Sequence, residues 1–487
     1  NIQNRRGCRK LAKVLTKGRP AKLIFLFSLP LIAGNLFQQF YSMADTLIVG
    51  RTLGVNALAA VGCTGSSTFL MLGFVTGATS GLSVVTSQEF GAGREERVKK
   101  SFAASIWVSI CMAIIFTILA VALVHPLLKL LQTPEDVIAD AEKYLRIIFL
   151  GIPVTILFNL LSNIIRALGD SRTPLYFLIL ASVVNIILDF VLILGGKMGV
   201  EGAALATVIA QLFSSVCCIF LIWKKMPILW IKKEDFKMSW GYLQRHLNLA
   251  LPMGFQSSII AIGSLILQYA LNGFGTTAVA AYTAAQKIDS IATMPMCSFG
   301  NAMATYVGQN YGAKQFERIK KGVNQCILMS GSFSIIMGII NVTQGSKLAM
   351  LFVGEGESEV IELSQVFLSI SGSLYLALAL LFIYRSSLQG MGNSFFPMCS
   401  GFIELAMRAI GALVLSKVLG FAGACVSSPL AWVGAAIPLA IVYYRTINKQ
   451  KGQEKEIDNT ECLMIKCINK NSGEGVADAV WRSKSTH

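Results

Sequence analysis

Long apolar runs separated by short polar segments occupy most of this chain. About 20 consecutive apolar residues are enough for a helix to cross a lipid bilayer. The pattern predicts six such spans in the first half, at 23–50, 57–88, 101–124, 137–160, 175–195 and 200–223. It predicts six more in the second half, at 246–271, 278–308, 323–345, 361–385, 397–418 and 421–444. We therefore expect an all-α polytopic membrane protein with 12 transmembrane helices.

The second half of the chain repeats the first at an interval of about 221–223 residues. Residues 88–92 (QEFGA) recur as 309–313 (QNYGA), and residues 169–174 (GDSRTP) recur as 392–397 (GNSFFP). Because each half has an even number of spans, both halves enter the membrane from the same side. The expected architecture is two six-helix lobes related by a parallel pseudo-two-fold repeat. Such duplication is typical of secondary transporters, whose substrate path lies where the repeats meet.

Composition and charge placement support a membrane protein and exclude a nucleic-acid partner. Hydrophobic residues make up 54% of the chain and charged residues 14%, against about 25% charged in soluble proteins. The net charge of +16 comes from the amino tail and from the segments 94–100, 224–245 and 314–321, whereas 354–362 is acidic. This alternation follows the positive-inside rule. We expect a multi-pass protein of the cytoplasmic (inner) membrane of a bacterium, with both termini cytoplasmic.

The same pattern divides the chain into five segments. We expect a basic cytoplasmic tail at 1–22, an amino-terminal lobe at 23–223, a cytoplasmic linker at 224–245, a carboxy-terminal lobe at 246–444 and a flexible cytoplasmic tail at 445–487. The linker mixes lysines with Trp230 and Trp240, which suits a segment at the inner membrane interface. We expect the protein to be a monomer in the lipid bilayer.

Enzyme and nucleotide-binding motifs are missing from the sequence. It has no phosphate-binding Gly-Lys-Ser/Thr loop, no His-Glu-x-x-His and no nucleophile elbow. We therefore expect no enzyme activity and no cofactor. Transport would be driven by an ion gradient rather than by ATP.

Two aspartates within apolar spans break the repeat. Leu267 stands opposite Asp45 in the second half, and Ile410 stands opposite Asp189. An ionised side chain at membrane depth costs about 2.5–3.5 kcal/mol on insertion scales, so it persists where it is paired, solvated or functional. An acidic pair in one half only indicates a coupling-ion site.

Neighbouring polar residues extend the acidic pair. Asn185 shares a helical face with Asp189, and Thr207 lies one span further along the chain. Carboxylate, amide and hydroxyl oxygens suit a hard cation such as Na⁺, while two adjoining carboxylates can instead carry a proton. A polar network that only stabilises the lobe is the third possibility. The candidate cation-coupling residues, and the metal ligands if the ion is Na⁺, are Asp45, Asn185, Asp189 and Thr207.

Residues 20–445 resemble the multidrug and toxic compound extrusion (MATE) family. The resemblance rests on the paired six-helix halves, the Gln-x-x-Gly-Ala loops that begin at Gln88 and Gln309, and the segment ALGDSRTP at 167–174. It implies a coupling cation within the amino-terminal lobe, at the four residues just named. It also implies Gln38, Tyr41 and Asn163 as lining groups.

Further substrate-cavity candidates follow from position. Gln38 and Tyr41 share a helical face with Asp45, and Gln256 and Lys287 are polar residues within spans of the second half. Lys287 has an interhelical structural role as its alternative. Glu404 and Arg408, four residues apart in one span, are expected to pair with each other.

Small residues crowd the predicted span 57–88. It contains Gly62, Gly65, Gly73, Gly77 and Gly81. Small residues let helices approach closely and also allow bending or sliding. Tight packing and a moving cavity wall are both consistent with this pattern.

Together these features predict a secondary-active multidrug antiporter. We expect it to export cationic or amphipathic small molecules, drugs or metabolites, in exchange for Na⁺ or H⁺ by alternating access. The main alternative is a flippase for lipid-linked saccharide or lipid substrates, which would need cationic residues in the cavity. A passive channel or receptor is a second alternative, and its flux would ignore an opposing ion gradient.

Overall fold

The computed structural model describes residues 13–130, 133–353 and 357–471. The regular elements in these residues are helices. The first half contains α2 (Pro20–Leu53), α3 (Val55–Gly91), α4 (Glu95–Leu130), α5 (Glu135–Leu150), α6 (Ile152–Ala167), α7 (Arg172–Asp189), the π-helical turn η1 (Phe190–Gly195) and α8 (Val200–Lys225). Two short 3-10 turns follow, η2 (Pro227–Leu229) and η3 (Lys233–Phe236). The second half contains α9 (Trp240–Asn272), α10 (Thr276–Gly312), α11 (Phe316–Val353), α12 (Ser358–Ser373), α13 (Tyr375–Gly390), α14 (Phe395–Ile410), the π-helical turn η4 (Gly411–Leu415) and α15 (Ser416–Asn471).

These helices give the predicted 12 spans. Eight helical stretches in the described residues are long and apolar enough to cross a membrane alone, and the bent pairs α5–α6 and α12–α13 supply two more. Gln286, Lys287 and Asp289 reduce the apolar character of α10, which is nevertheless 37 residues long. The apolar stretch Phe395–Gln450 divides at Gly420, where φ is 60°. The predicted all-α class and its two-lobe layout of 12 helices are confirmed.

The two halves show matching departures from regular helix geometry. The α5–α6 pair bends by 47° and the α12–α13 pair by 50°. Gly169 and Gly392 have φ values of 84° and 88° at equivalent turns, a left-handed conformation that favours glycine. The π-helical turns η1 and η4 also follow equivalent helices. The repeat seen in the sequence is therefore a repeat of backbone structure.

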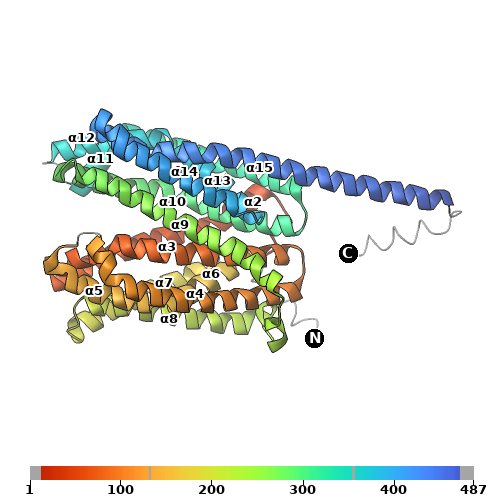
Figure 1. The fold of residues 1–487 in the computed structure, drawn as a ribbon, viewed down its shortest axis with the longest axis horizontal. Helices are drawn as coiled ribbons and strands as arrows, with labels where there is room; N and C mark the ends of the chain where they lie inside the picture. Colours follow the sequence, from red (N-terminus) through yellow and green to blue (C-terminus); the bar gives the residue numbers. More distant parts are fainter. Residues whose placement is uncertain (1–12, 131–132, 354–356, 472–487) are drawn as a thin grey trace. The chain divides into compact units, whose positions relative to one another are not determined.

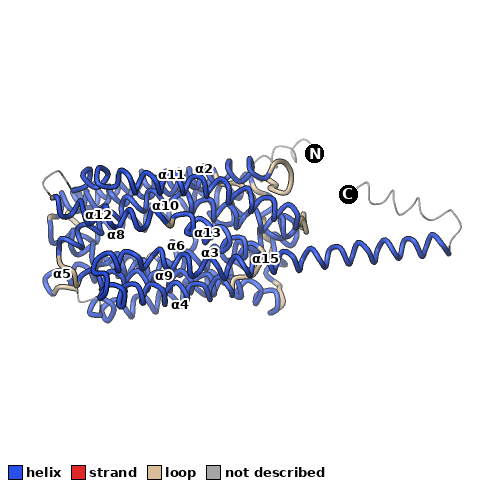
Figure 2. Tube along the Cα trace, turned by 90° about the horizontal axis from the view of Figure 1, so that it is seen from above, coloured by secondary structure: helices blue, strands red, loops and turns tan. Residues whose placement is uncertain are grey.

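The halves meet mainly through α2 and α3 of the first half and α9 and α10 of the second, and α3 contacts both α9 and α10. α3 packs against α9, and α2 packs against α10 (Figures 1 and 2). A β-carbon on Gly77 would overlap the carbonyl oxygen of Met253, and one on Gly81 would lie 2.7 Å from that of Leu249. These glycines bring the α3 and α9 backbones together, as small residues do in membrane helix pairs.

A large apolar core lies mainly in the first half and extends to Ala250 on α9. Leu82, Phe149 and Ile164 are fully buried there, on α3, α5 and α6. Leu229, in the predicted linker, belongs to the same core and is 2% exposed. Trp230 and Trp240 are exposed.

The chain divides into two compact units, Asn1–Ala440 and Ile441–His487. The first unit contains the helices described above as far as residue 440. In the second, the segment expected to be flexible is helical up to Asn471. The parts of the predicted tails at 1–12 and 472–487 lie outside the described residues, as does 354–356 of the acidic loop.

Candidate functional site

The fold brings Asp45 and Asp189 together between α2 and α7. Their carboxyl groups are close enough to share a hydrogen bond when one of them holds a proton. Asp189 is fully buried, and Asp45 is partly exposed. Asp189 is the last residue of α7 and directly precedes η1. A π-helical turn changes the helix repeat locally and frequently occurs at functional sites.

Thr207 on α8 organises the polar side chains beside this pair. Its hydroxyl donates to the carbonyl oxygen of Ala203 at 3.1 Å. Thr207 Oγ1 accepts a hydrogen bond from Asn185 Nδ2 at 3.2 Å, and the Tyr41 hydroxyl oxygen lies 3.4 Å from Thr207 Oγ1. Both lone pairs of the Thr207 oxygen are therefore directed toward protein donors. The Oδ1 atom of Asn185 remains for another partner.

Four buried oxygen atoms at this site lack a hydrogen-bond donor within the described part of the chain. No ion pair between described residues includes either aspartate at 4.0 Å or less. A buried carboxylate without a partner is costly, so this oxygen set suits a hard cation or a shared proton. The four atoms are Asp45 Oδ1, Asn185 Oδ1, Asp189 Oδ1 and Asp189 Oδ2.

Tyr144 on α5 also belongs to this region, although the sequence did not single it out. Its phenol interacts electrostatically with Asp45, Tyr41 and Asp189. Its ring packs against an apolar cluster that includes Val49. Tyr144 was missed because it lies among Glu142, Lys143 and Arg146, in a segment without an obvious functional pattern. Only the packing of α5 beside α8 reveals its position.

The remaining cavity candidates of the first half, Gln38 and Asn163, have different surroundings. Gln38 is exposed on α2. Asn163 Nδ2 donates to Thr79 Oγ1 on α3 at 3.4 Å, and Asn163 Oδ1 accepts from Arg166 at 3.4 Å. The amide of Asn163 therefore connects α6 with α3, and the described contacts do not join it to the aspartate pair.

The two second-half candidates have different surroundings. Gln256 is 4% exposed, donates to the carbonyl oxygen of Pro397 at 2.7 Å and accepts from Gln389 at 2.9 Å. Its amide joins α9 to α13 and α14. Lys287 is exposed on α10. Nearby, Asp289 accepts a hydrogen bond from the Tyr375 hydroxyl at 2.7 Å.

The expected pairing of Glu404 with Arg408 is wrong. Glu404 forms a buried ion pair with Arg385 of α13 instead. Arg408 turns toward α9, where its Nη1 atom donates to the carbonyl oxygen of Ile260 at 3.2 Å. Spacing along one helix could not predict this arrangement, because the competing partners come from other helices.

Comparisons with known proteins cover both halves of the chain. The MatE family model matches twice, at residues 30–191 and 252–414. A probable multidrug resistance protein of Bacillus subtilis, YoeA, is 29% identical over 435 residues, which are 88% of each chain. A probable multidrug resistance protein of Thermotoga maritima, NorM, is 26% identical over 85% of this chain and 88% of its own.

A solved structure shows the same fold. It is described as the outward-facing conformation of a multidrug resistance MATE family transporter and is 22% identical. The TM-score is 0.84, and the match covers 91% of this chain and 98% of the solved one. With the family model matched in both halves, the chain belongs to the MatE family of membrane transporters and is not an enzyme.

Proposed function

We propose that this protein is a secondary-active multidrug antiporter of a bacterial inner membrane, with both termini in the cytoplasm. It exports small cationic or amphipathic molecules in exchange for Na⁺ or H⁺. The observation that carries the proposal is the buried oxygen cluster of Asp45, Asn185 and Asp189, which has four unpaired oxygens and no basic partner among the described residues. Its place in only one half of a repeated structure supports a coupling role over a requirement of the fold.

The coupling cation would act by changing the balance between two conformations of the transporter. Two adjoining carboxylates on α2 and α7 repel each other when both are ionised. A bound cation or proton removes that repulsion and allows α2 to pack more closely on α7. A ligand that binds both conformations equally tightly does not shift the equilibrium between them, so the cation and the drug must prefer different conformations. The cation favours the state that releases the drug outside.

The net charge that crosses the membrane in one exchange determines how much the membrane potential contributes to transport. Each net charge that crosses the membrane contributes about 2.3 kcal/mol per 100 mV. Exchange of one Na⁺ or H⁺ for one monovalent cationic drug moves no net charge, so only the chemical gradient drives it. Export of a neutral compound for one inward cation also uses the membrane potential. Cationic and neutral substrates should therefore respond differently to voltage.

The names of the relatives support drug export over lipid flipping. The B. subtilis and T. maritima relatives are both described as probable multidrug resistance proteins. The site itself is acidic, whereas an anionic lipid head group would require cationic residues. These observations favour the antiporter.

Ethidium efflux from proteoliposomes tests the proposal. The protein is reconstituted with ethidium inside, and an inward Na⁺ gradient or an inward proton gradient is imposed separately. Efflux that accelerates with only one gradient identifies the coupling ion and supports antiport. The Asp45→Asn/Asp189→Asn double variant serves as the control for leakage. Efflux that is indifferent to both gradients would refute the antiporter.

A further inference from the structure

The two copies of the Gln-x-x-Gly-Ala motif contact each other across the two halves. A β-carbon on Gly91 would overlap the backbone oxygen of Gln309, and one on Gly312 would overlap that of Gln88. Each glycine therefore lies directly against the glutamine of the other motif. Only a residue without a side chain allows the ends of α3 and α10 to pass so closely. The repeated motif thus forms the junction between the halves at this end of the molecule.

Each glutamine also binds a helix end in the opposite half. Gln88 Nε2 donates to the carbonyl oxygen of Gly390, the last residue of α13, at 2.9 Å. Gln309 Nε2 donates to the carbonyl oxygen of Ala167, the last residue of α6, also at 2.9 Å. The last carbonyl groups of a helix lack partners within it, so each amide satisfies an otherwise unpaired acceptor. Separation of the halves at this end would break both bonds.

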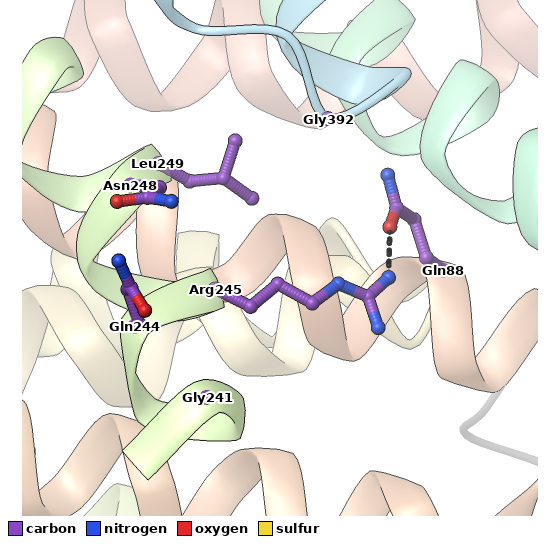
Figure 3. Close-up of a pocket in the computed structure, with 7 residues that line it drawn as sticks. All are labelled: Gln88, Gly241, Gln244, Arg245, Asn248, Leu249 and Gly392. Carbon is purple, nitrogen blue, oxygen red and sulfur yellow. Dashed lines mark hydrogen bonds between the residues drawn. The ribbon is translucent and has the colours of Figure 1, made fainter.

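The oxygen atoms of the two amides have different partners. Gln88 Oε1 accepts a hydrogen bond from Arg245 Nη2 at 2.7 Å (Figure 3). Gln309 Oε1 accepts one from the backbone N–H of Leu15, also at 2.7 Å. The donor to Gln88 is thus the side chain of Arg245 at the start of the second half, whereas the donor to Gln309 is the backbone of Leu15, which precedes the first half. The repeat is asymmetric at this point.

The segment 13–15 is bound by both halves. Lys13 N donates to the carbonyl oxygen of Leu168, after α6, at 3.0 Å. The carbonyl oxygen of Leu15 accepts from Arg318 Nη2 at 3.2 Å and from Asn310 Nδ2 at 3.4 Å. The contacts use backbone atoms of the segment, the turn after α6, and side chains on α10 and α11. They connect the first half directly with the second.

A pocket marks the equivalent position beside the other glutamine. It has a volume of about 370 Å³ (Figure 3). Gly392 lines this pocket, whereas its counterpart Gly169 lies directly against the backbone oxygen of Lys13. Residues 13–15 therefore occupy on one side the position that remains a pocket on the other. The pocket is lined by Gln88, Gly241, Gln244, Arg245, Asn248, Leu249 and Gly392.

We propose that Gln88 and Gln309 are positioning residues that hold the cytoplasmic gate closed, and that residues 13–15 form a strap that must be released for it to open. The cytoplasmic location rests on the proposed function. The strap leads into α2, which begins at Pro20 and carries Asp45. Ala21 N, in the first turn of α2, donates to Gln325 Oε1 on α11 at 2.9 Å. A movement of α2 at the cation site is thereby transmitted to the gate.

Spin labels on either side of the gate provide the test. Glu95→Cys and Gln315→Cys, at exposed positions, carry the labels in full-length protein whose native cysteines are replaced by serine. Pulsed electron spin resonance measures the distance distribution between the two labels in the reconstituted protein. Leu15→Pro removes the N–H that binds Gln309, whereas Leu15→Ala retains it and serves as the matched control. Loss of this hydrogen bond should raise the ratio of open to closed gate by roughly five-fold. Equal distance distributions in Leu15→Pro and Leu15→Ala would refute the proposed role of the strap.

The glutamines are tested by isosteric replacement. In Gln309→Glu the side chain still accepts from Leu15 but cannot donate to Ala167, and in Gln88→Glu it still accepts from Arg245 but cannot donate to Gly390. Both variants should increase the open population, and the double variant should increase it further. No change in either single variant would refute a gating role for the glutamines.

A truncation that begins at residue 16 provides a second test if Leu15→Pro does not fold. It should open the gate as the proline variant does, and an unchanged distance distribution would refute the strap. Gradient-driven ethidium efflux in the unmodified protein tests the antiporter independently. A gate that does not respond to these changes refutes the strap and leaves that function standing, whereas gradient-independent efflux refutes the function.

Discussion

At the scale of single residues, three buried or partly buried aspartates in the first half have different environments. Asp170 is 7% exposed, and its Oδ1 atom accepts from the backbone N–H groups of Arg172 at 3.0 Å and Thr173 at 3.1 Å. These bonds cap the start of α7. Asp45 and Asp189 have unpaired oxygens instead. The same residue type therefore stabilises a helix in one place and has unpaired oxygens available to a ligand in the other.

Asp45→Asn and Asp189→Asn should each reduce gradient-driven efflux by at least about ten-fold. The amide cannot exchange a proton or neutralise a cation, and the lost coupling contact to a charged group corresponds to about 1.5–3 kcal/mol. Thermal unfolding in detergent should occur at an unchanged or higher temperature, because a neutral amide is less costly to bury. Efflux assays and melting curves of the same preparations measure both effects.

Asp170→Asn is the matched control for these variants. Asparagine caps a helix about as well as aspartate and retains an oxygen that can accept from the Arg172 and Thr173 N–H groups, so stability should change little while the response to an ion gradient persists. If Asp170→Asn removed coupling, or if Asp189→Asn retained it, the assignment of the cation site would be wrong.

The sequence predicts the composition of the candidate site better than its geometry. Asp45, Asn185, Asp189 and Thr207 stand out as polar residues within apolar spans and lie on the adjoining helices α2, α7 and α8. That Thr207 binds Asn185 instead of presenting a free oxygen depends on rotamers and helix rotation, which the linear pattern does not contain. The position of Tyr144 depends on the packing of α5 and is equally hidden.

At the scale of helices, α3 has two kinds of glycine. Gly77 lies against the backbone of α9, where a β-carbon would overlap the carbonyl oxygen of Met253. A β-carbon on Gly62 or Gly65 would meet no atom within 4 Å. The crowded glycines predicted from the sequence therefore include close-packing positions near the middle of α3 and open positions near its start.

Gly77→Ala should destabilise the protein, whereas Gly62→Ala should not. The new methyl group at position 77 forces the α3 and α9 backbones apart, at a cost of about 1–3 kcal/mol. At position 62 alanine fits and improves helix propensity by about 0.5–1 kcal/mol. Thermal unfolding in detergent compares the two variants. Equal melting temperatures would show that the α3–α9 contact does not limit stability.

Helix boundaries were predictable where apolar runs are continuous. The predicted span 57–88 corresponds to α3 and the span 200–223 to α8. The breaks within spans were not predictable, because the α5–α6 bend at Gly151 and the turn η1 leave the hydrophobic pattern uninterrupted. Bends of this kind arise from packing, which a hydropathy pattern does not record.

At the scale of the whole molecule, repeated structure and unrepeated charge have separate roles. The matching bends and turns give both halves the same backbone. The acidic pair occurs in the first half only, and the 13–15 strap, which contacts both halves, fills only one of two equivalent positions of the repeat. We infer that the cation energises one half and that the helix pairs between the halves transmit the change.

Charge distribution predicts the orientation of this repeated structure in the membrane. Lysines and arginines surround the turn before α11, whereas glutamates surround the turn after it. α11 has 38 residues and is long enough to place exposed Gln315 and exposed Glu357 at opposite membrane faces. In intact cells, a membrane-impermeant maleimide should therefore label Glu357→Cys and spare Gln315→Cys, and inside-out vesicles should reverse the pattern. The unmodified protein reports background labelling of the native cysteines. Labelling of Gln315→Cys from outside intact cells would invert the orientation and place the strap and its gate on the external face.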